Sequence, residues 1–171
     1  MLEILAPVGN EACANAAINN GADAIYLGLS AFSARQSAEN FDEAAFRRLI
    51  LRAHCLGVKV YVAMNTLVKD TEIADFFKNL LFAWNAGADA IIMQDLLLGE
   101  GVHELYPQIV LHASTQAGIC TATGAEFAKK CGFSRVILAR ETPLSEIAEI
   151  AKLIETEVFV QGALCTCFSG Q

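Results

Sequence analysis

One joint recurs four times along this sequence and restricts the fold more than any other feature. A helical pattern ends, a glycine follows, and an apolar strand pattern begins within about three residues. The glycines of the four joints are 36, 30 and 45 residues apart. Each glycine suits the left-handed backbone conformation that closes a helix, and each Val- and Ile-rich run after it suits a strand buried on both faces. The sequence therefore predicts a repeating β/α unit with joints at Gly21, Gly57, Gly87 and Gly132.

Seven strand patterns alternate with helical patterns along the chain. Such alternation predicts a parallel sheet, and the closed TIM (β/α) barrel of eight strands is the commonest fold of this kind. We expect an α/β fold, parallel and TIM-barrel-like, with seven strands in a single domain over residues 1–171. A complete barrel needs about 250 residues and an eighth strand, so we also expect a truncated barrel domain of a longer protein, ending before the eighth unit. The expected strands are Glu3–Ala6, Ala24–Leu27, Lys59–Ala63, Ala90–Met93, Ile109–His112, Val136–Ala139 and Glu157–Val160.

Helix boundaries are predicted where a capping residue precedes an apolar stripe. The clearest helix covers Phe41–Cys55, with Asp42 as its expected cap and apolar residues at three- and four-residue spacing after it. Asp70 or Thr71 is expected to cap the next helix. Pro143 fits the first turn of a later helix, where a missing N–H does no harm.

The composition favours a globular protein with a large core. Apolar residues make up 54% of the chain and charged residues only 18%, which is enough to bury a core at this length. Charge or glycine interrupts every apolar run before about 18 residues, and the N-terminus has no basic flank, so we expect no membrane span, no signal peptide and a cytoplasmic location. The net charge of −7 argues against binding of nucleic acid by this chain, because phosphate contacts require clustered Lys and Arg residues. An RNA substrate would have to be held by regions outside this chain.

Polar residues gather just after the expected strands of this mostly apolar chain. The carboxyl ends of barrel strands converge on one face, so the residues beyond them become neighbours. We select Asn65, His112, Gln116 and Arg140 as candidate site residues, with Arg140 suited to a carboxylate or phosphate of a small anionic ligand. The alternatives are a core imidazole for His112 and an ion pair with Glu141 for Arg140. The other exits carry Pro7, Gly9, Asn10, Gly28, Gln94, Asp95, Ser114, Thr115, Gln161 and Gly162.

Other polar residues have structural explanations. Asn10 could simply cap the first helix, and His54 lies at a helix end, where a contact with the last carbonyls is the better explanation. His103 has no local support for a further role. Four cysteines lie in or beside helical patterns, where a free cysteine is usually a small core residue. These are Cys13, Cys55, Cys120 and Cys131.

The last fourteen residues hold the most distinctive chemistry of the chain. Val158–Val160 are expected to be a buried strand that leads directly into Gln161, Gly162 and two thiols. A C-x-C pair alone is a weak metal signal, because zinc sites usually add a second pair or histidines. A strand that is followed directly by two cysteines nevertheless predicts a site at Cys165 and Cys167.

A set of motifs runs in order along essentially the whole chain. They are E-I-L-A-P-V-G-N, A-D-A-I-Y-L-G, F-S-A-R-Q-S-A-E-N-F, N-T-L, H-A-S-T-Q, V-I-L-A-R-E and G-A-L-C-T-C-F-S-G-Q. Together they resemble the N-terminal region of the collagenase-like peptidase family, which is also called peptidase family U32.

The resemblance implies one of two enzyme classes. Some members are reported collagenases, although this sequence has no H-E-x-x-H and no G-x-S-x-G motif. Others resemble oxygen-independent hydroxylases of RNA bases or ubiquinone precursors, which carry an iron-sulfur cluster on four cysteines and take the oxygen from prephenate. On this comparison Cys165 matches the first cluster ligand, and Cys167 has no assigned role. Gln161 stands where the family usually has a histidine.

We therefore expect a fragment of an iron-sulfur hydroxylase, with Arg140 available for an anionic oxygen donor. A genuine peptidase and a non-catalytic accessory barrel are the alternatives. Because the chain brings one cluster ligand, or two with Cys167, it should not assemble the cluster and should be inactive alone. Cys165 with His112 is the one pair that would suit a cysteine peptidase. An unclosed barrel edge also predicts self-association into a homo-oligomer.

Overall fold

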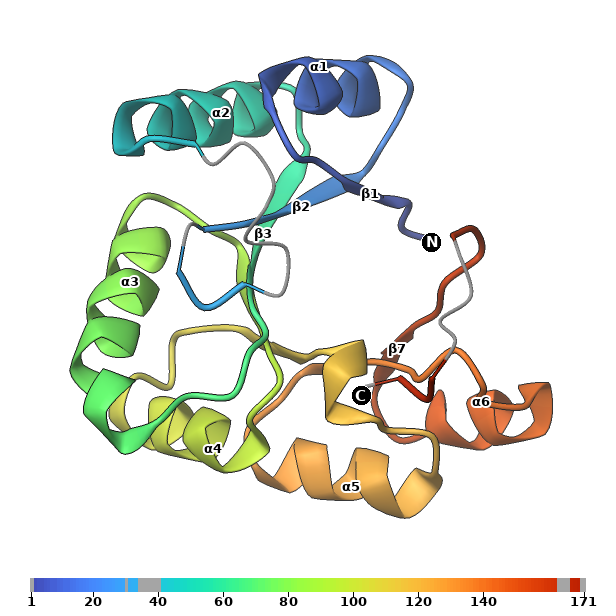
Figure 1. Cartoon of the computed structure of the whole chain (residues 1–171). Helices are drawn as coiled ribbons and strands as arrows, with labels where there is room; N and C mark the ends of the chain where they lie inside the picture. Colours follow the sequence, from blue (N-terminus) through green and yellow to red (C-terminus); the bar gives the residue numbers. More distant parts are fainter. Residues whose placement is uncertain (1, 30, 34–40, 163–166, 170–171) are drawn as a thin grey trace. The chain divides into compact units, whose positions relative to one another are not determined.

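The computed structural model describes residues 2–29, 31–33, 41–162 and 167–169. The strands form one sheet in the order β1 to β7, so each strand lies beside the next strand of the chain. Their pairing is parallel, and a helix lies in every connection (Figure 1). The strands are β1 (Leu5–Pro7), β2 (Ala24–Gly28), β3 (Lys59–Met64), β4 (Ala90–Met93), β5 (Leu111–Ala113), β6 (Arg135–Ile137) and β7 (Glu155–Glu157). The helices are α1 (Glu11–Asn19), α2 (Glu43–Cys55), α3 (Ile73–Asn85), α4 (Leu96–Leu105), α5 (Ala122–Lys130) and α6 (Leu144–Ile150), with the 3₁₀ turns η1 (Asp70–Glu72) and η2 (Thr115–Ala117).

This connectivity confirms the predicted parallel, TIM-barrel-like fold with seven strands. The eighth strand of a complete barrel is not among the described residues. The chain divides into two compact units, Met1–Ile91 and Ile92–Gln171, and each is described by itself below. In the described part of the chain, no helix is both long enough and apolar enough to cross a membrane.

The prediction for the last strand was wrong. β7 is Glu155–Glu157, and Val158, Phe159 and Val160 are exposed by 42%, 43% and 94% rather than buried. The cause is the register with β6, in which Ile137 is the last paired residue and stands opposite Glu157. Leu138 still donates its N–H to the Glu157 carbonyl at 3.0 Å, but the Ala139 N–H donates to the Ile119 carbonyl at 2.9 Å instead. The chain after β6 has therefore left the ladder by Ala139.

The four joints have the predicted geometry. Gly21, Gly57, Gly87 and Gly132 all have positive φ, between 74° and 107°, which glycine adopts without steric penalty. At three of the four joints, the side chain of the polar residue two positions later bonds to the backbone of the preceding strand or of the residue just before it. The bonds run from Ile4 N–H to Asp23 Oδ2 (2.8 Å), from Val60 N–H to Asp89 Oδ2 (2.7 Å), and from Ser134 Oγ to the Leu111 carbonyl (3.1 Å).

The helices begin close to the predicted positions. Asp42 caps α2 by accepting the Ala45 N–H at 2.7 Å, and the stripe of α2 is buried as expected. Pro143 lies directly before α6 with φ of −67°, which confirms that proline fits this helix start. The predicted cap of α3 was wrong. Asp70 and Thr71 belong to a separate 3₁₀ turn before α3, in which the Glu72 carboxylate accepts the Lys69 N–H at 3.0 Å.

An ion-pair cluster around a buried arginine holds the polar strand β7 in the sheet. The Arg135 side chain is only 7% exposed, and its guanidinium lies 2.7 Å from Glu155 and 3.3 Å from Glu157. Residues two apart on a strand point to the same face, so both carboxylates reach one guanidinium. A buried arginine needs such partners, because an uncompensated buried charge is strongly destabilising.

Two glycines of α4 give a matched test of the packing in the second unit. A Cβ on Gly99 would clash with the buried Phe133 ring, whereas a Cβ on Gly101 would meet nothing within 4 Å. Alanine is otherwise the better helix former by about 1 kcal/mol. We predict that Gly99→Ala lowers the free energy of unfolding and that Gly101→Ala raises it, as measured by urea denaturation. Equal effects of the two substitutions would contradict the packing described here.

The Asp89 joint gives a second test, in the first unit. The carboxylate accepts the buried Val60 N–H and also lies 2.9 Å from His54 Nε2. We predict that Asp89→Ala costs about 1 to 3 kcal/mol, because it leaves a buried donor without its partner. His54→Ala should cost under about 1 kcal/mol, since the contact it removes is partly exposed. Thermal unfolding monitored by circular dichroism checks both; a His54 effect as large as that of Asp89 would refute this account.

Candidate functional site

The four candidate residues divide between the two units. Asn65 directly follows β3 in the first unit and is half-buried. His112, Gln116 and Arg140 belong to the second unit, in or after β5 and β6. We describe these three residues together.

The exit of β5 is a compact polar turn. His112 lies within β5, 3% exposed and in register with Arg135 of β6. After the strand, Ser114 Oγ accepts the Gln116 N–H at 3.2 Å, and Thr115 Oγ donates to the Leu138 carbonyl at 3.1 Å. These bonds fix the backbone that carries the half-buried Gln116 and tie it to the exit of β6.

The exit of β6 turns sharply. Both the Thr142 N–H (3.1 Å) and the Thr142 hydroxyl (2.6 Å) donate to the Ala139 carbonyl. The turn presents two consecutive charged residues, Arg140 and Glu141, directly after the buried strand. A guanidinium and a carboxylate are therefore available at this exit.

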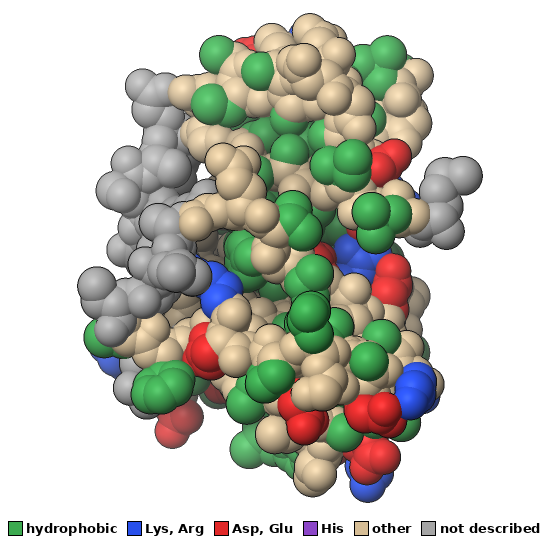
Figure 2. Space-filling view, turned by 90° about the vertical axis from the view of Figure 1, so that its right-hand side faces the viewer, with side chains coloured by type: hydrophobic (Ala, Val, Ile, Leu, Met, Phe, Trp, Pro, Cys, Tyr) green, Lys and Arg blue, Asp and Glu red, His purple; other side chains and the backbone are tan. Residues whose placement is uncertain are grey.

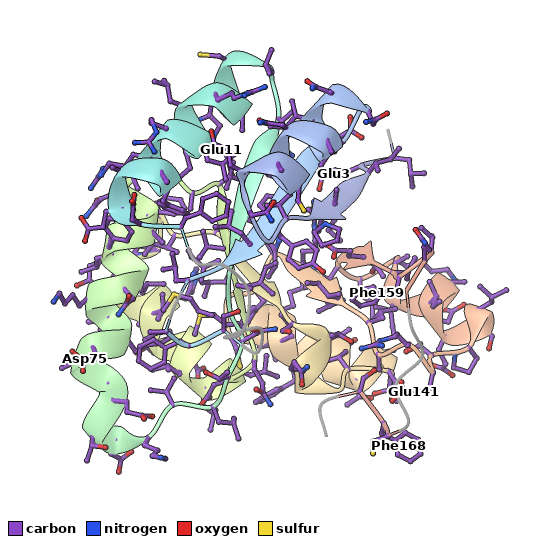
Figure 3. The ribbon with its side chains drawn as sticks, turned by 45° about the horizontal axis from the view of Figure 1, so that its top comes forward. Glu3, Glu11, Asp75, Glu141, Phe159 and Phe168 are labelled. Carbon is purple, nitrogen blue, oxygen red and sulfur yellow. The ribbon has the colours of Figure 1, made fainter. Side chains whose placement is uncertain are left out.

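Glu141 and Arg140 bind Ser169, which lies near the end of the chain. The Ser169 N–H donates to Glu141 Oε1 at 2.9 Å, and the Ser169 hydroxyl donates to Glu141 Oε2 at 3.0 Å. The Arg140 backbone N–H donates to Ser169 Oγ at 3.1 Å. We call these three bonds the Ser169 clamp; Glu141 and the exposed Phe168 beside it are labelled in Figure 3.

The clamp changes the acid-base behaviour of Glu141. The backbone N–H of Ser169 is the main cause that lowers the pKa of this carboxyl below its ordinary value of 4.5, with help from the nearby Arg140 charge. A lowered pKa in the folded state means that the contribution of the bonds is present above the ordinary value. It is lost only as the pH falls through the lowered value.

Arg140 and Phe159 are in contact. The guanidinium carbon lies 5.2 Å from the centre of the Phe159 ring, within the range of a cation–π interaction. Phe159 follows β7, as Arg140 follows β6, so the contact joins the exits of two adjacent strands. Figure 3 labels Phe159 and Glu141 in this part of the second unit. Apolar and charged side chains both reach the surface on the face drawn in Figure 2.

The cysteines do not share one environment. Cys165 lies outside the described residues, and Cys167 is exposed. Cys131 is buried, as predicted, and burial raises the pKa of its thiol. The core prediction was wrong for Cys13 and Cys55, which are exposed because they lie on the outer faces of α1 and α2. Cys120 is half-buried.

Among the described residues, no three His, Cys, Asp or Glu side chains are grouped so that they could hold a metal ion. The metal-ligand assignment of Cys165 and its pairing with His112 therefore stay predictions.

Asn10, His54 and His103 all have structural contacts in the described part of the chain. Asn10 caps α1 by accepting the Cys13 N–H at 2.9 Å, as its structural explanation requires. His54 bonds to Asp89 rather than to the last carbonyls of α2, because the joint between α3 and β4 places Asp89 Oδ2 2.9 Å from His54 Nε2. His103 packs against Gly132, where any Cβ would clash with its ring.

Sequence reasoning missed Ser169 and Phe159 as parts of this site. Ser169 contacts Glu141 across 28 residues, and a Ser-Gly pair normally indicates only a turn. Phe159 was assigned to a buried strand, so its exposed ring at a strand exit was not considered. Its place outside the strand follows from the register with β6, which ends at Glu157 and is not visible in the sequence.

The sequence is similar to proteins named for RNA modification and for proteolysis. It is 39% identical to the 23S rRNA 5-hydroxycytidine C2501 synthase of Escherichia coli and 38% identical to tRNA hydroxylation protein P of Haemophilus influenzae. It is 31% identical to a collagenase of Porphyromonas gingivalis. Each comparison covers 99% of this chain but only 26%, 37% and 44% of the respective relative. The chain thus spans less than half the length of these relatives.

The fold matches that of a solved U32 peptidase, Mk0906. The TM-score is 0.72 at 13% identity, over 92% of this chain and 67% of that one. Phosphonopyruvate hydrolase, at a TM-score of 0.61 and 13% identity over 92% of this chain and 66% of that one, shares the fold alone. The profile of Peptidase family U32 matches residues 9–171, and the chain therefore belongs to peptidase family U32.

Proposed function

We propose that this chain is part of an iron-sulfur-dependent, oxygen-independent hydroxylase that acts on a base of RNA. Two kinds of observation support the proposal. Relatives named for tRNA or rRNA hydroxylation are 36% to 39% identical over 99% of the chain. The structure adds polar and cationic side chains at the exits of β5 and β6, which is where barrel enzymes carry their chemistry.

The observation that carries the proposal is the anchoring of Ser169 at the exit of β6. Ser169 is bound to the exit of β6, beside Arg140, and follows Cys165 by four residues in the sequence. An iron-sulfur ligand near Cys165 would thus be close in sequence to a residue anchored at the strand exits.

The donor set of this chain is not sufficient for a cluster. Four thiolates usually hold such a cluster, while this segment supplies Cys165 and at most Cys167. The other described cysteines lie on α1, at the end of α2, before α5 and at the end of α5. The remaining ligands would have to come from other parts of a longer protein, so we derive no chemical step through the cluster.

The side chains of this chain have binding roles in the proposal. Arg140 supplies a fixed positive charge for a small anionic oxygen donor, with prephenate as the proposed molecule. Its guanidinium is oriented by Phe159, which leaves less freedom to lose when an anion binds. His112 and Gln116 of the second unit are the proposed polar contacts to the substrate, and Asn65 of the first unit stays a prediction from the sequence. We place the reaction in the cytoplasm, where RNA substrates are present.

A peptidase is the second candidate. It is supported by the names of two relatives, the collagenase at 31% identity and the uncharacterized protease MJ0090 of Methanocaldococcus jannaschii at 36% identity. Within this chain, Cys165 and His112 would have to act as nucleophile and base. The structure does not describe Cys165, so this pair rests on the sequence.

The hydroxylase proposal predicts both a chromophore and a modified base. We expect the full-length protein, purified without oxygen, to be brown and to contain iron and acid-labile sulfide. Nucleosides from RNA incubated with it and prephenate should show one added oxygen by mass spectrometry. Cys165→Ala should remove the cluster and the activity, whereas Cys55→Ala, at an exposed thiol on α2, should leave both unchanged.

The same preparation distinguishes the alternatives. Cleavage of gelatin that disappears in both Cys165→Ala and His112→Ala would replace the hydroxylase with a cysteine peptidase. A full-length protein with neither iron nor either activity would favour the accessory barrel.

A further inference from the structure

Positive charge gathers on the outer face of α2, although the chain as a whole is acidic. The helix contains three arginines and one glutamate, whereas the net charge of the chain is −7. Arg47, Arg48 and Arg52 are all exposed. The three guanidinium groups therefore belong to the surface of the first unit. The buried side of the same helix consists of Phe46, Leu49, Ile50 and Ala53.

In the described part of the chain, none of these three arginines forms an ion pair. The cations that do form ion pairs there include His54, Lys59, Arg135 and Lys152. Arg48 and Arg52 are four residues apart, so they are neighbours on the helix surface and their charges repel each other. Since no described carboxylate compensates this repulsion, an anion bound from outside would relieve it.

Arg47 is held in place by an aromatic ring. Its guanidinium carbon lies 5.3 Å from the centre of the Phe82 ring of α3, within the range of a cation–π interaction. The Phe82 ring itself packs on Phe46 of α2, with the ring centres 5.6 Å apart. The contact restricts the Arg47 side chain without engaging a hydrogen-bond acceptor, so its N–H donors remain available to a ligand. Less freedom is then lost when an anion binds.

We propose that Arg47, Arg48 and Arg52 form a contact surface for the phosphate backbone of RNA, which we call the arginine face of α2. Arginine suits phosphate because its planar guanidinium can donate two parallel N–H bonds to one phosphate group. Arg48 and Arg52 lie about 6 Å apart along the helix axis, so both can reach phosphates of one strand. The choice of RNA among polyanions rests on the proposed function.

The arginine face has the chemistry to bind phosphates but not to read bases. The exposed apolar side chain among the arginines is Leu51, at 67% exposure. It has no hydrogen-bonding group for a base edge and no ring on which a base could stack. Contacts to phosphates position a nucleic acid without carrying sequence information. The net charge of the chain does not oppose such contacts, because binding depends on where positive charge gathers.

Salt-dependent RNA binding by the full-length protein tests the arginine face. The variants are Arg48→Gln and the double substitution Arg47→Gln/Arg48→Gln, because glutamine has nearly the helix propensity of arginine. Fluorescence anisotropy of a labelled single-stranded RNA gives the Kd at several salt concentrations. We expect a roughly five-fold or larger loss of affinity per arginine at about 0.1 M salt. The slope of log K against log salt should become shallower by about 0.7 for each lost contact.

A matched control removes one exposed cation elsewhere. Lys130→Gln, at the end of α5 in the second unit, changes the net charge by the same amount as Arg48→Gln. It should leave both the Kd and the salt slope unchanged. Two RNAs of different sequence should lose affinity by the same factor in the double variant. An unchanged melting temperature of each variant shows that the helix is intact.

Three results would overturn the arginine face. One is an unchanged Kd and salt slope in the double variant. Another is an equal loss of affinity in Lys130→Gln, which would reflect net charge alone. The third is weaker binding of polyglutamate by the double variant with unchanged RNA affinity, which would mean that the surface fits an acidic protein.

The same measurements separate this inference from the proposed function. A wild type that adds no oxygen to RNA, but whose RNA affinity falls in the double variant, would refute the hydroxylase and leave the arginine face standing. A wild type that hydroxylates RNA, with the same RNA affinity in the double variant, would refute the arginine face alone. A wild type without affinity for RNA would refute both.

Discussion

The structure depends on one bond that is repeated where successive strands begin. A joint glycine reverses the chain, and the carboxylate two residues later takes the backbone N–H of the neighbouring strand, as Asp23 does for Ile4 and Asp89 does for Val60. The bond helps to fix the register between two neighbouring strands. A one-residue slip would move every side chain to the opposite face. These carboxylates therefore help to determine which residues of the strands of the first unit reach the carboxyl end of the sheet.

The sequence was sufficient to predict the features that depend on local conformation. Positive φ at a joint glycine, an Asp cap before α2 and a proline before α6 are all set within a few residues. The position of β7 depends instead on where β6 ends. The apolar run Val158–Val160 has strong strand propensity, but the pairing stops at Glu157, and propensity does not replace a missing neighbour.

In the candidate site, too, some residues could be selected from the sequence and others depend on distant contacts. Arg140 and Gln116 could be selected because polar residues after buried strands are unusual in so apolar a chain. Ser169 could not, because its importance comes from Glu141, 28 residues earlier, and from the close approach of Gly118. Phe159 was hidden for a different reason, since an aromatic residue in an apolar run indicates a core. Contacts between distant residues decide which ordinary side chains matter, and single-sequence patterns do not contain them.

The ion-pair cluster around Arg135 makes β6 an unsuitable place for the sheet to stop. An apolar edge strand can be removed at the expense of exposed hydrocarbon, which another surface can cover. Removing β7 would take Glu155 and Glu157 away from the Arg135 guanidinium, whose side chain is 7% exposed in the intact sheet. It would also remove the strand paired with Arg135, so the guanidinium would exchange these two carboxylates for water. Among fragments of this protein that end at different residues, those that keep Glu155 and Glu157 should therefore retain an intact sheet edge. Those that end before Glu155 should not.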